Sequence, residues 1–455
     1  MTPQVRSYRT ALLWTLALVT LYWVLHRVPV PTAVQVLDLS SEKWRRSFYW
    51  FNILRVGFLP VLSSFFLVEF LSLFVPPLSR WRLRGAPGRE KLNLWAWRLC
   101  VPITFIQAWG HSYYLLSYAQ YPLHMSHFWF HMTNIAAFSG GTFLAVWLAR
   151  LITRLGVGNG FVILYFSSLI RNFYEDAGDW GRKFLKTAPT GDQWIWFDVM
   201  VLLLVATLFF LWKYLQQSPV IALKGKGRKF FYEIAPFPSS IVLQTYALGL
   251  VSTVKSGVSY YNTGLNEPIP VDWMSLGLPH VLLECGLILL LGWVFYVWLY
   301  GEIDAFGLSV GNLALSLKKN PKVLQEQFWK SMVVFLVGVA LFWIPWGGGV
   351  GPIYWLVNFV TLIYLFAVVQ DLCAYWCFWR DHGPGVELLE MDNVHLASYV
   401  KGLFEAARIP CHIQTYYFRR LYFLFRPLYK MRLLVPEKAA GKARKLLATV
   451  KYQVV

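Results

Sequence analysis

Charged residues are scarce in this sequence. Only 14% of its 455 residues are Asp, Glu, Lys or Arg, whereas a soluble globular domain carries about 25%. Acidic residues are the scarcest, with 23 Asp and Glu against 42 Lys and Arg. So few charges exclude an ordinary water-soluble protein of several domains. The excess of basic residues fits loops that face anionic lipid or an acidic, RNA-bearing partner.

Cysteines and the side-chain sets of enzymes are also scarce. No Ser-His-Asp set, paired-carboxylate site or nucleotide fingerprint stands out, so we expect no enzyme and no cofactor. The cysteines form no CxxC pair and fall mostly in apolar runs, which excludes a disulfide framework or a cysteine zinc site. We interpret all five as packing residues: Cys100, Cys285, Cys373, Cys377 and Cys411.

Three histidines in the stretch "HMSHFWFH" raise the question of a metal site. His127 and His131 are one helical turn apart, as two zinc ligands on a helix would be. His124 precedes them, but no carboxylate or cysteine lies nearby to complete a ligand set. The stretch is rich in aromatic residues, which gather where a membrane meets water. We therefore favour interfacial histidines and expect no metal.

Long apolar runs are what the sequence has in abundance. It is 57% hydrophobic and 18% aromatic, and runs of about 20 apolar residues can cross a bilayer as helices. The first run lacks a small-residue cleavage site, so we expect a retained span. The pattern predicts an all-α polytopic membrane protein with about ten transmembrane helices, near 9–27, 54–76, 97–118, 130–153, 157–173, 195–215, 237–255, 279–300, 329–346 and 352–379.

Basic residues gather in alternate loops, which predicts the orientation of the chain. The positive-inside rule places such loops in the cytoplasm, and an even number of spans then puts both termini there. Lys43, Arg45, Arg46 and a group near 182–186 are exceptions. The basic residues that follow the rule are Arg6, Arg9, Arg80, Arg82, Arg84, Arg89, Lys91, Arg150, Arg154, Lys224, Lys226, Arg228, Lys229, Lys318, Lys319 and Lys322.

A short glycine-rich turn interrupts the apolar stretch "WLARLITRLGVGNGFVILYFSSLI". Gly156, Gly158 and Gly160 lie in it, with Arg150 and Arg154 on one side. A phosphate-binding loop would follow a strand and be followed by Lys-Ser or Lys-Thr, and neither feature is present. We interpret this stretch as a cytoplasmic turn between the fourth and fifth spans.

At this turn the sequence resembles a known family. "ITRLGVGNG" resembles the "ITE-GIGNG" turn of SecY, the central subunit of the Sec translocon. "RVPVP", "VGFLPVLSSFFLVEFLSLFVPPL", "RGAPGREKLNLWAWRLCVPITFIQAWG" and "FYVWLYGEIDAFGLSVGNLALSLKKN" resemble other SecY segments in the same order. The resemblance covers most of residues 9–380. It implies two inverted five-helix halves, residues 1–173 and 174–380, around an hourglass pore that can open sideways into lipid.

The resemblance also implies site residues. A ring of bulky apolar side chains at the waist would seal the pore by dewetting, and the matching positions are Leu62, Phe66, Leu169 and Leu248. Packing against a neighbouring helix is the alternative for each leucine. Lateral-gate candidates are Ser63, Ser64, Glu69 and Gln107. Cytoplasmic partner-binding candidates are Arg84, Arg89, Lys91, Arg154, Lys224, Lys226, Arg228, Lys229, Lys318 and Lys319.

The chain departs from the family pattern in three places. The segment between the first two spans is too short for the family's plug with its Gly-Gly turn. The eighth loop, "LKKNPKVLQEQFWKS", lacks the "IRPG" whose arginine serves the SecA motor. Acidic residues near the glycine turn are replaced by Arg150 and Arg154. These departures indicate a divergent paralogue with an altered plug and altered motor-binding loops.

Residues 386–450 have a different character from the apolar runs. "VELLE", "IPCHIQTY" and "MRLLVP" predict strands, and "DNVHLASYVKGLFEAAR" and "EKAAGKARKLL" predict helices. This βαββα order resembles a small bacterial ferredoxin-like module assigned to signal transduction. Between its parts, "YYFRRLYFLFRPLYK" mixes basic and aromatic residues, which suits lipid headgroups, ribosomal RNA or a basic insertion on the membrane.

Three functional hypotheses follow. The first is a specialised SecY-like channel in a bacterial inner membrane, which translocates or inserts unfolded or nascent polypeptides. It implies SecE-like and SecG-like small subunits and a ribosome or a motor ATPase as partners. The second is a non-conducting SecY-derived scaffold or regulator that acts through its C-terminal domain. The third is a small-molecule transporter, which inverted repeats would also suit.

Overall fold

The computed structural model describes part of the chain. The described residues are 8–33, 51–83, 86–116, 125–165, 167–168, 220–225, 228–233, 359–391, 394–417 and 430–449, with a few single positions between 206 and 329. Most of the expected second half, residues 174–380, lies outside them. The described part of the fold is therefore mainly the expected first half, the last expected span and the C-terminal residues.

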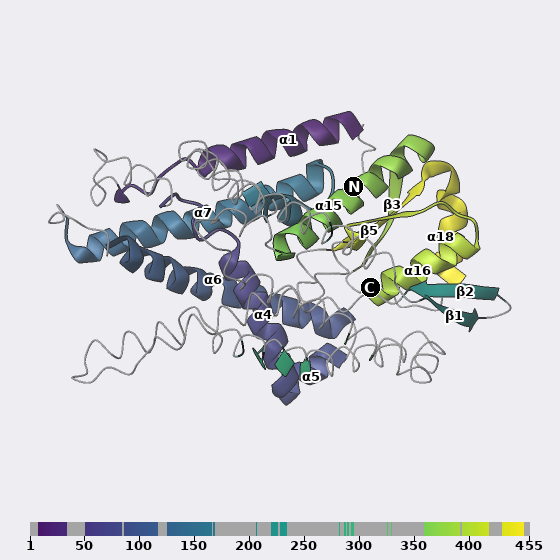
Figure 1. Ribbon diagram of the computed structural model, residues 1–455, viewed down its shortest axis with the longest axis horizontal. Helices are drawn as coiled ribbons and strands as arrows, with labels where there is room; N and C mark the ends of the chain where they lie inside the picture. Colours follow the sequence, from purple (N-terminus) through teal and green to yellow (C-terminus); the bar gives the residue numbers. More distant parts are fainter. Residues whose placement is uncertain are drawn as a thin grey trace, which may run out of the picture.

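Five long helices dominate the described residues (Figure 1). Four of them match expected spans to within a few residues at most ends: α1 (Tyr8–Leu25), α4 (Leu59–Phe74), α7 (His127–Leu155) and α15 (Phe359–His382). The fifth, α6 (Ala86–Leu116), covers the expected third span and extends well before it. The expected spans at 195–215, 237–255, 279–300 and 329–346 lie largely outside the described residues, so the number of ten stays a prediction.

The connection between the second and third expected spans is largely helical, which the sequence had not indicated. α5 (Pro76–Leu83) directly follows α4, and α6 already begins at Ala86. Many basic residues indicated a loop, but Arg, Lys, Leu and Ala are also good helix formers. The prolines lie in the first turns of the two helices, where the missing N–H costs nothing. The third span therefore continues as a helix beyond the expected membrane surface.

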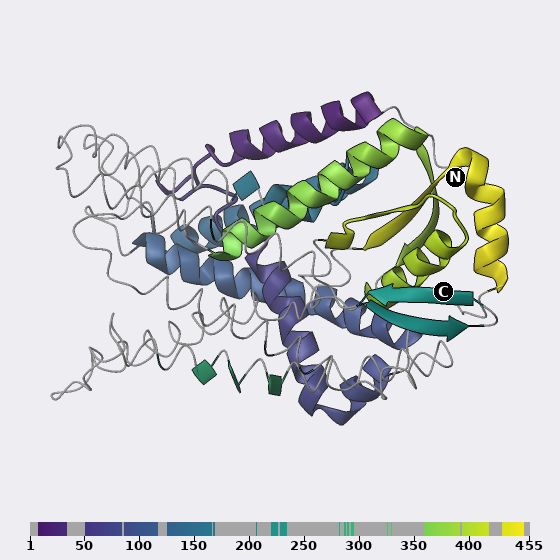
Figure 2. The ribbon, with the colours of Figure 1, turned by 45° about the vertical axis from the view of Figure 1, so that its right-hand side comes forward.

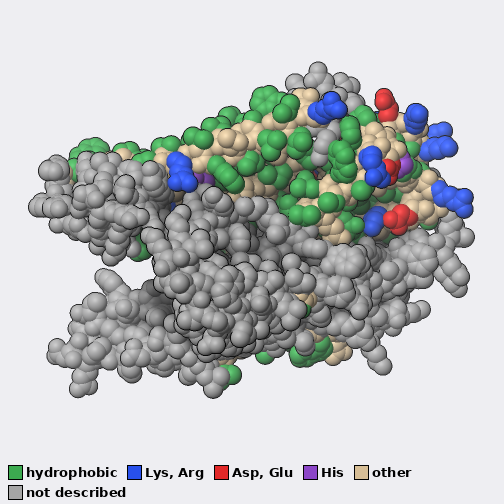
Figure 3. Space-filling view, turned by 45° about the horizontal axis from the view of Figure 1, so that its top comes forward, with side chains coloured by type: hydrophobic (Ala, Val, Ile, Leu, Met, Phe, Trp, Pro, Cys, Tyr) green, Lys and Arg blue, Asp and Glu red, His purple; other side chains and the backbone are tan. Residues whose placement is uncertain are grey.

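The surface of the helices is apolar. Large hydrophobic side chains lie exposed on them, including Leu13 on α1, Ile106 on α6 and Trp129 on α7. In Figure 3, hydrophobic side chains spread along the helices, and charged ones gather at the end where the C-terminal residues lie. Among the described helices, α7 is long and apolar enough to cross a membrane by length and composition, and shorter apolar helices span Arg9–Leu25 and Leu59–Ser72. Such exposed apolar area fits contact with lipid.

The helices of the first half share one core. α4 packs against α6, α6 against α7, and α1 against α7. Val61 and Phe65 of α4 lie fully inside this core, as do Ala96 of α6 and Leu148 of α7. Small residues on α6 and α7 allow the close approach of helices that membrane packing requires.

Residues 51–58 form a buried connection between the first and second spans. Pro29 and Asn52 form an antiparallel bridge, Val30 N donates to Phe51 O at 2.8 Å, and Ile53 N donates to Val28 O at 3.0 Å. The side chains of Phe51 and Leu54 are almost completely buried. This segment is thus tied to the end of the first span rather than exposed as a loop.

The C-terminal domain, residues 385–449, has the predicted βαββα order. It comprises β3 (Gly385–Met391), α16 (Val394–Ala406), β4 (His412–Gln414), β5 (Met431–Pro436) and α18 (Ala440–Thr449), with a short 3-10 turn at Glu437–Ala439. β5 lies between β3 and β4, and both pairings are antiparallel. The order of elements is confirmed, whereas the ferredoxin-like assignment and the boundaries 386–450 stay predictions.

A β-hairpin lies in the sixth loop. β1 (Val220–Gly225) pairs with β2 (Arg228–Glu233), with Val220 opposite Glu233 and Gly225 opposite Arg228. We call it the sixth-loop hairpin. Its basic residues had indicated a loop, although the aromatic "KFFY" has high β-propensity. β2 lies against α16 of the C-terminal domain (Figure 2).

Candidate functional site

α4 has two faces, and they carry the pore-ring candidates of the first half. The helix begins with Pro60 in its first turn, where proline is well tolerated. Phe65 points into the core of the first half and contacts Trp97 of α6 edge to face, with ring centroids 5.3 Å apart. Leu62 and Phe66 lie one turn apart on a different, half-buried face. Of these three side chains, only that of Phe65 is fully buried.

The half-buried face carries a row of aromatic rings. Phe66 stacks on Phe70 with centroids 5.7 Å apart and an interplanar angle of 20°, and Phe70 contacts Phe74 at 5.1 Å. Residues at this four-residue spacing lie above one another on a helix. The row itself is apolar, and the half-buried carboxylate of Glu69 lies beside it, three residues after Phe66 on the same side of α4. The other ring candidates, Leu169 and Leu248, lie outside the described residues.

The lateral-gate candidates differ in their surroundings. Gln107 Nε2 of α6 donates a hydrogen bond to Ser63 Oγ of α4 at 3.2 Å, so these two candidates meet. Ser64 is buried and donates to the carbonyl of Val61 within its own helix at 2.8 Å. Glu69 lies half-buried on α4. The meeting pair joins the second and third spans of one half, and its role in a gate stays a prediction.

The glycine elbow, residues 156–160, is an ordered turn. Gly158 has φ +76°, which favours glycine. A Cβ on Gly160 would overlap the carbonyl oxygen of Ala149 and lie 2.7 Å from its carbonyl carbon. Gly160 N donates to Thr153 Oγ1 at 2.8 Å, and the Asn159 side chain accepts from Phe161 N at 3.0 Å. The glycines therefore serve a tight backbone turn, and Asn159 caps the helix that follows it.

The first span also holds this elbow. Val157 N donates to Thr15 Oγ1 of α1 at 2.8 Å, and Tyr22 Oη of α1 and Ser168 Oγ lie at hydrogen-bonding distance, 2.9 Å. The sequence had placed Asn159 in the turn without a role for its side chain, and it had not indicated Thr15 or Thr153. An Asn directly before an apolar run is a helix-start pattern that could have indicated the cap. The contacts of Thr15 are too distant in sequence for any such pattern.

A buried polar network links three segments of the first half. Asn134 of α7 accepts a short hydrogen bond from Thr32 and donates to Ser112 of α6 at 3.2 Å. Ser112 Oγ lies 2.8 Å from Nδ1 of His131. His131, one of the three histidines considered for a metal, is thus engaged with neighbouring polar side chains. The end of the first span and the third and fourth spans are joined by these bonds.

The basic partner-binding candidates lie on several elements. Lys91 of α6 is exposed, with its Nζ 5.9 Å from the ring centroid of Trp81, and Arg154 is exposed in the last turn of α7. The backbone of Arg89 belongs to α6. The backbones of Lys224, Arg228 and Lys229 belong to the sixth-loop hairpin. The remaining candidates, Arg84, Lys226, Lys318 and Lys319, lie outside the described residues.

Comparisons with known proteins agree on one family. A family model described as SecY matches residues 52–229. The protein translocase subunit SecY of Bacillus subtilis (strain 168) is 23% identical over 287 residues, which are 57% of this chain and 66% of that protein. This chain therefore spans slightly less than two thirds of that relative. The segment matched by the family model, residues 52–229, includes α4, the glycine elbow and most of the sixth-loop hairpin.

Solved structures show the same fold. A protein-conducting channel superposes with a TM-score of 0.55 at 13% identity, over 80% of this chain and 92% of that chain. Sec61 in a canine ribosome–channel complex from the endoplasmic reticulum superposes with a TM-score of 0.53 at 12% identity, over the same shares of the two chains. At such identity the likeness establishes the fold alone. The family model, the curated relatives and the fold all show similarity of this chain to SecY proteins.

Proposed function

We propose that this chain is the channel subunit of a SecY-type translocon, which moves unfolded or nascent polypeptides across or into a bacterial plasma membrane. One observation carries the proposal. α4 buries Phe65 in the core of the first half, whereas Leu62 and Phe66 pack against the edge of that core and stay half-buried. In a fold like that of a protein-conducting channel, this half-buried face suits the pore waist.

Residues 51–58 support a specialised version of this channel. The related SecY structures include one whose plug domain stabilizes the closed state. In this chain residues 51–58, the described end of the connection between the first two spans, are bonded to the end of the first span and pack against α7. We propose that it acts as a fixed part of the wall and that a separate movable plug is reduced. The altered motor-binding loops expected from the sequence belong to the same proposal.

The proposed partners follow from the channel assignment. They are a SecE-like and a SecG-like small membrane subunit, the translocating polypeptide, the lipid bilayer and a ribosome or a motor ATPase. Sec61, a structural relative, is known in a complex with the ribosome. Exposed basic side chains such as Arg154 suit the acidic surface of such a partner. The proposal places both termini in the cytoplasm.

An alternative is a non-conducting SecY-derived scaffold or regulator. The contacts of the C-terminal domain with the glycine elbow and with α15 favour it, because they join a cytoplasmic module to the membrane helices. Under this alternative the half-buried face of α4 would be covered by helices of the second half. The two functions differ in a measurable quantity, the ion conductance of a variant with a widened waist.

The experiment compares Phe66→Gly with Leu67→Gly. Both substitutions cost about 1 kcal/mol of helix propensity, but Leu67 is 38% exposed, whereas Phe66 is half-buried. The purified protein is reconstituted into planar bilayers, and conductance is recorded. A channel predicts that Phe66→Gly leaks ions and that Leu67→Gly stays closed. If neither variant conducts ions, the scaffold is favoured. If both variants conduct equally, the substitutions have loosened the packing of α4 without revealing a pore face.

A further inference from the structure

The C-terminal domain follows the last expected span with almost no linker. α15 ends at His382 and β3 begins at Gly385. Gly383 has φ +76°, and its N–H bonds the Trp379 carbonyl at 2.8 Å, which ends the helix. A Cβ on Gly385 would lie 3.0 Å from the Phe378 ring and 3.0 Å from Leu434 Cβ. The first strand therefore starts in direct contact with α15, which restricts how far the domain can move.

α15 provides one side of the docking contact. Asp371 is only 8% exposed, and its Oδ1 accepts a hydrogen bond from Tyr417 N of the domain at 2.9 Å. A buried carboxylate that loses such a partner is costly, because its charge is then poorly solvated. The ring of His412 lies between helix and sheet, with centroids 5.3 Å from Tyr375 and 5.7 Å from Phe378.

The last turn of α7, directly before the glycine elbow, provides the second side. Arg432 Nη1 of β5 donates to the carbonyl oxygen of Thr153 at 3.1 Å. Thr153 lies in the last turn of α7, where carbonyls have no partner within the helix and carry partial negative charge. Glu387 and Glu390 lie 3.9 Å from Arg432 Nε and hold the guanidinium in place. The arginine thus caps the helix from another domain.

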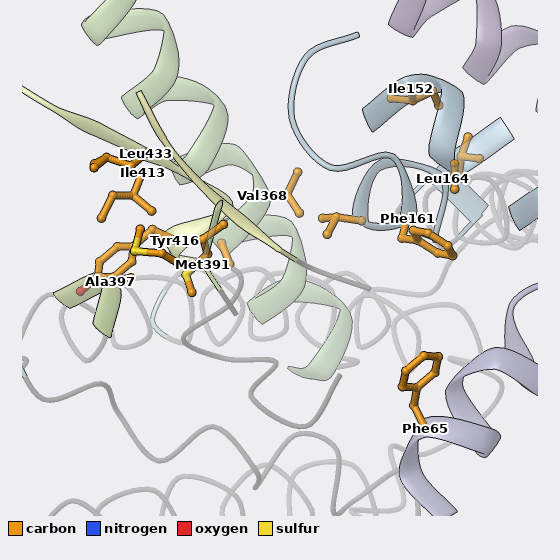
Figure 4. Close-up of a cluster of buried hydrophobic side chains, with 14 of the residues drawn as sticks. Phe65, Ile152, Phe161, Leu164, Val368, Met391, Ala397, Ile413, Tyr416 and Leu433 are labelled. Carbon is orange, nitrogen blue, oxygen red and sulfur yellow. The ribbon is translucent and has the colours of Figure 1, made fainter. Parts of the chain in front are cut away.

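Little space remains between the domain and the elbow. The cavity that Gly158, Asn159, His412 and Thr415 help to line has a volume of about 30 Å³, room for only one or two waters. In Figure 4, Val368 of α15 lies between Ile413 of the domain and Phe161, which directly follows the elbow. Their side chains belong to one continuous hydrophobic cluster.

The sixth-loop hairpin touches the third side of the domain. α16 lies against β2 (Figure 2), so one small domain contacts two separate cytoplasmic loops and the last span. The hairpin carries Lys224, Arg228 and Lys229, which are among the residues expected to receive a cytoplasmic partner. Access to this loop then depends on whether the domain is docked.

We propose that the C-terminal domain is a built-in cover of the sixth-loop hairpin and the glycine elbow. While docked, it occupies the surface of these loops, and a soluble cytoplasmic partner reaches the hairpin only after the domain has moved away. The identity of the covered loop as a partner-binding loop rests on the proposed function. The cover itself rests on the contacts of Arg432, Asp371 and α16.

Trypsin cleavage of the full-length protein in detergent tests the cover. The two strands of the hairpin contain three trypsin sites, Lys224, Arg228 and Lys229. Arg432→Ala removes the elbow contact, and Asp371→Asn weakens the contact with α15. Loss of a charge-assisted hydrogen bond is expected to raise the undocked population, and with it the cleavage rate at the hairpin, about tenfold. Lys442→Ala, at an exposed position of α18, is the matched control.

The pattern of cleavage rates decides whether the domain covers the hairpin. Faster hairpin cleavage in Arg432→Ala and Asp371→Asn with an unchanged rate in Lys442→Ala supports the cover. An intermediate rate in Arg432→Lys, which keeps the charge but not the planar fork, supports it further and guards against misfolding of the alanine variant. Equal rates in all proteins, or faster cleavage in Lys442→Ala as well, would overturn it. None of these results depends on conduction, so the proposed channel stands or falls separately.

Discussion

Two adjacent glycines of α7 allow a matched test of how residues 51–58 are placed. A Cβ on Gly141 would overlap the carbonyl oxygen of Ile53 and lie 2.6 Å from its carbonyl carbon, closer than the 3.0 Å that real Cβ atoms keep. A Cβ on Gly140 would meet nothing within 4 Å. The same substitution to alanine therefore has opposite consequences at neighbouring positions of one helix.

The magnitudes follow from two opposing terms. Alanine in place of glycine inside a helix stabilises it by up to about 1 kcal/mol. Overpacking a tight contact costs about 1 to 3 kcal/mol, and the upper value applies at Gly141 because the overlapped atoms are backbone, which cannot rotate away. Gly141→Ala should thus lower the free energy of unfolding by about 2 kcal/mol, and Gly140→Ala should raise it by up to about 1 kcal/mol. The two variants should differ by about 3 kcal/mol.

The assay is equilibrium unfolding of both variants and the parent protein. SDS is titrated into protein held in dodecyl maltoside micelles, and tryptophan fluorescence follows the transition. The prediction is an earlier midpoint for Gly141→Ala and an equal or later one for Gly140→Ala. Equal midpoints for the two variants would refute the placement of residues 51–58 against α7, and with it the proposed fixed wall.

Three further predictions concern other contacts. Burial, with a smaller contribution from Lys401, lowers the pKa of His412 to about 4, so between pH 6.5 and 4 the unfolded chain binds a proton that the folded domain excludes. Stability is therefore full above pH 6.5 and should fall by about 3 kcal/mol as the pH drops to 4; His412→Gln should remove this slope in pH-dependent unfolding. Ser63→Ala removes the bond from Gln107 and should cost about 1 kcal/mol in the same SDS titration; no change would show that the bond is not formed in micelles. Asn134→Ala leaves buried partners unsatisfied and should cost about 2 kcal/mol, and a smaller loss than for Ser63→Ala would contradict the network.

Local patterns made part of the fold predictable. Apolar runs near 20 residues indicated α1, α4, α7 and α15, and the short apolar run "MRLLVP" indicated β5, because each pattern reflects one element alone. The helical conformation of the connection between the second and third spans was not predicted, since basic residues such as Arg80 suit both loops and helix surfaces. The sixth-loop hairpin was missed because its strands are short and lie between spans.

Contacts between distant segments could not be predicted. Thr153 and Arg432 are 279 residues apart in the sequence, and Thr15 and Val157 are 142 apart. No local pattern records such a pair, because either residue alone suits a solvent-exposed or helical position. The likeness to SecY indicated α4 and the elbow, but it carried no information about a docked C-terminal domain, which lies outside residues 52–229 matched by the family model.

Site-specific photocrosslinking to a translocating polypeptide tests the channel most directly. p-Benzoylphenylalanine replaces Phe66 on the half-buried face of α4 or Leu67 on its exposed face, and a radiolabelled secretory precursor is arrested during transport into vesicles that contain the variant. The channel predicts a crosslink between the precursor and position 66 and none with position 67. A precursor that enters the vesicles without contacting position 66, or that contacts both positions equally, would contradict a polypeptide path along this face of α4.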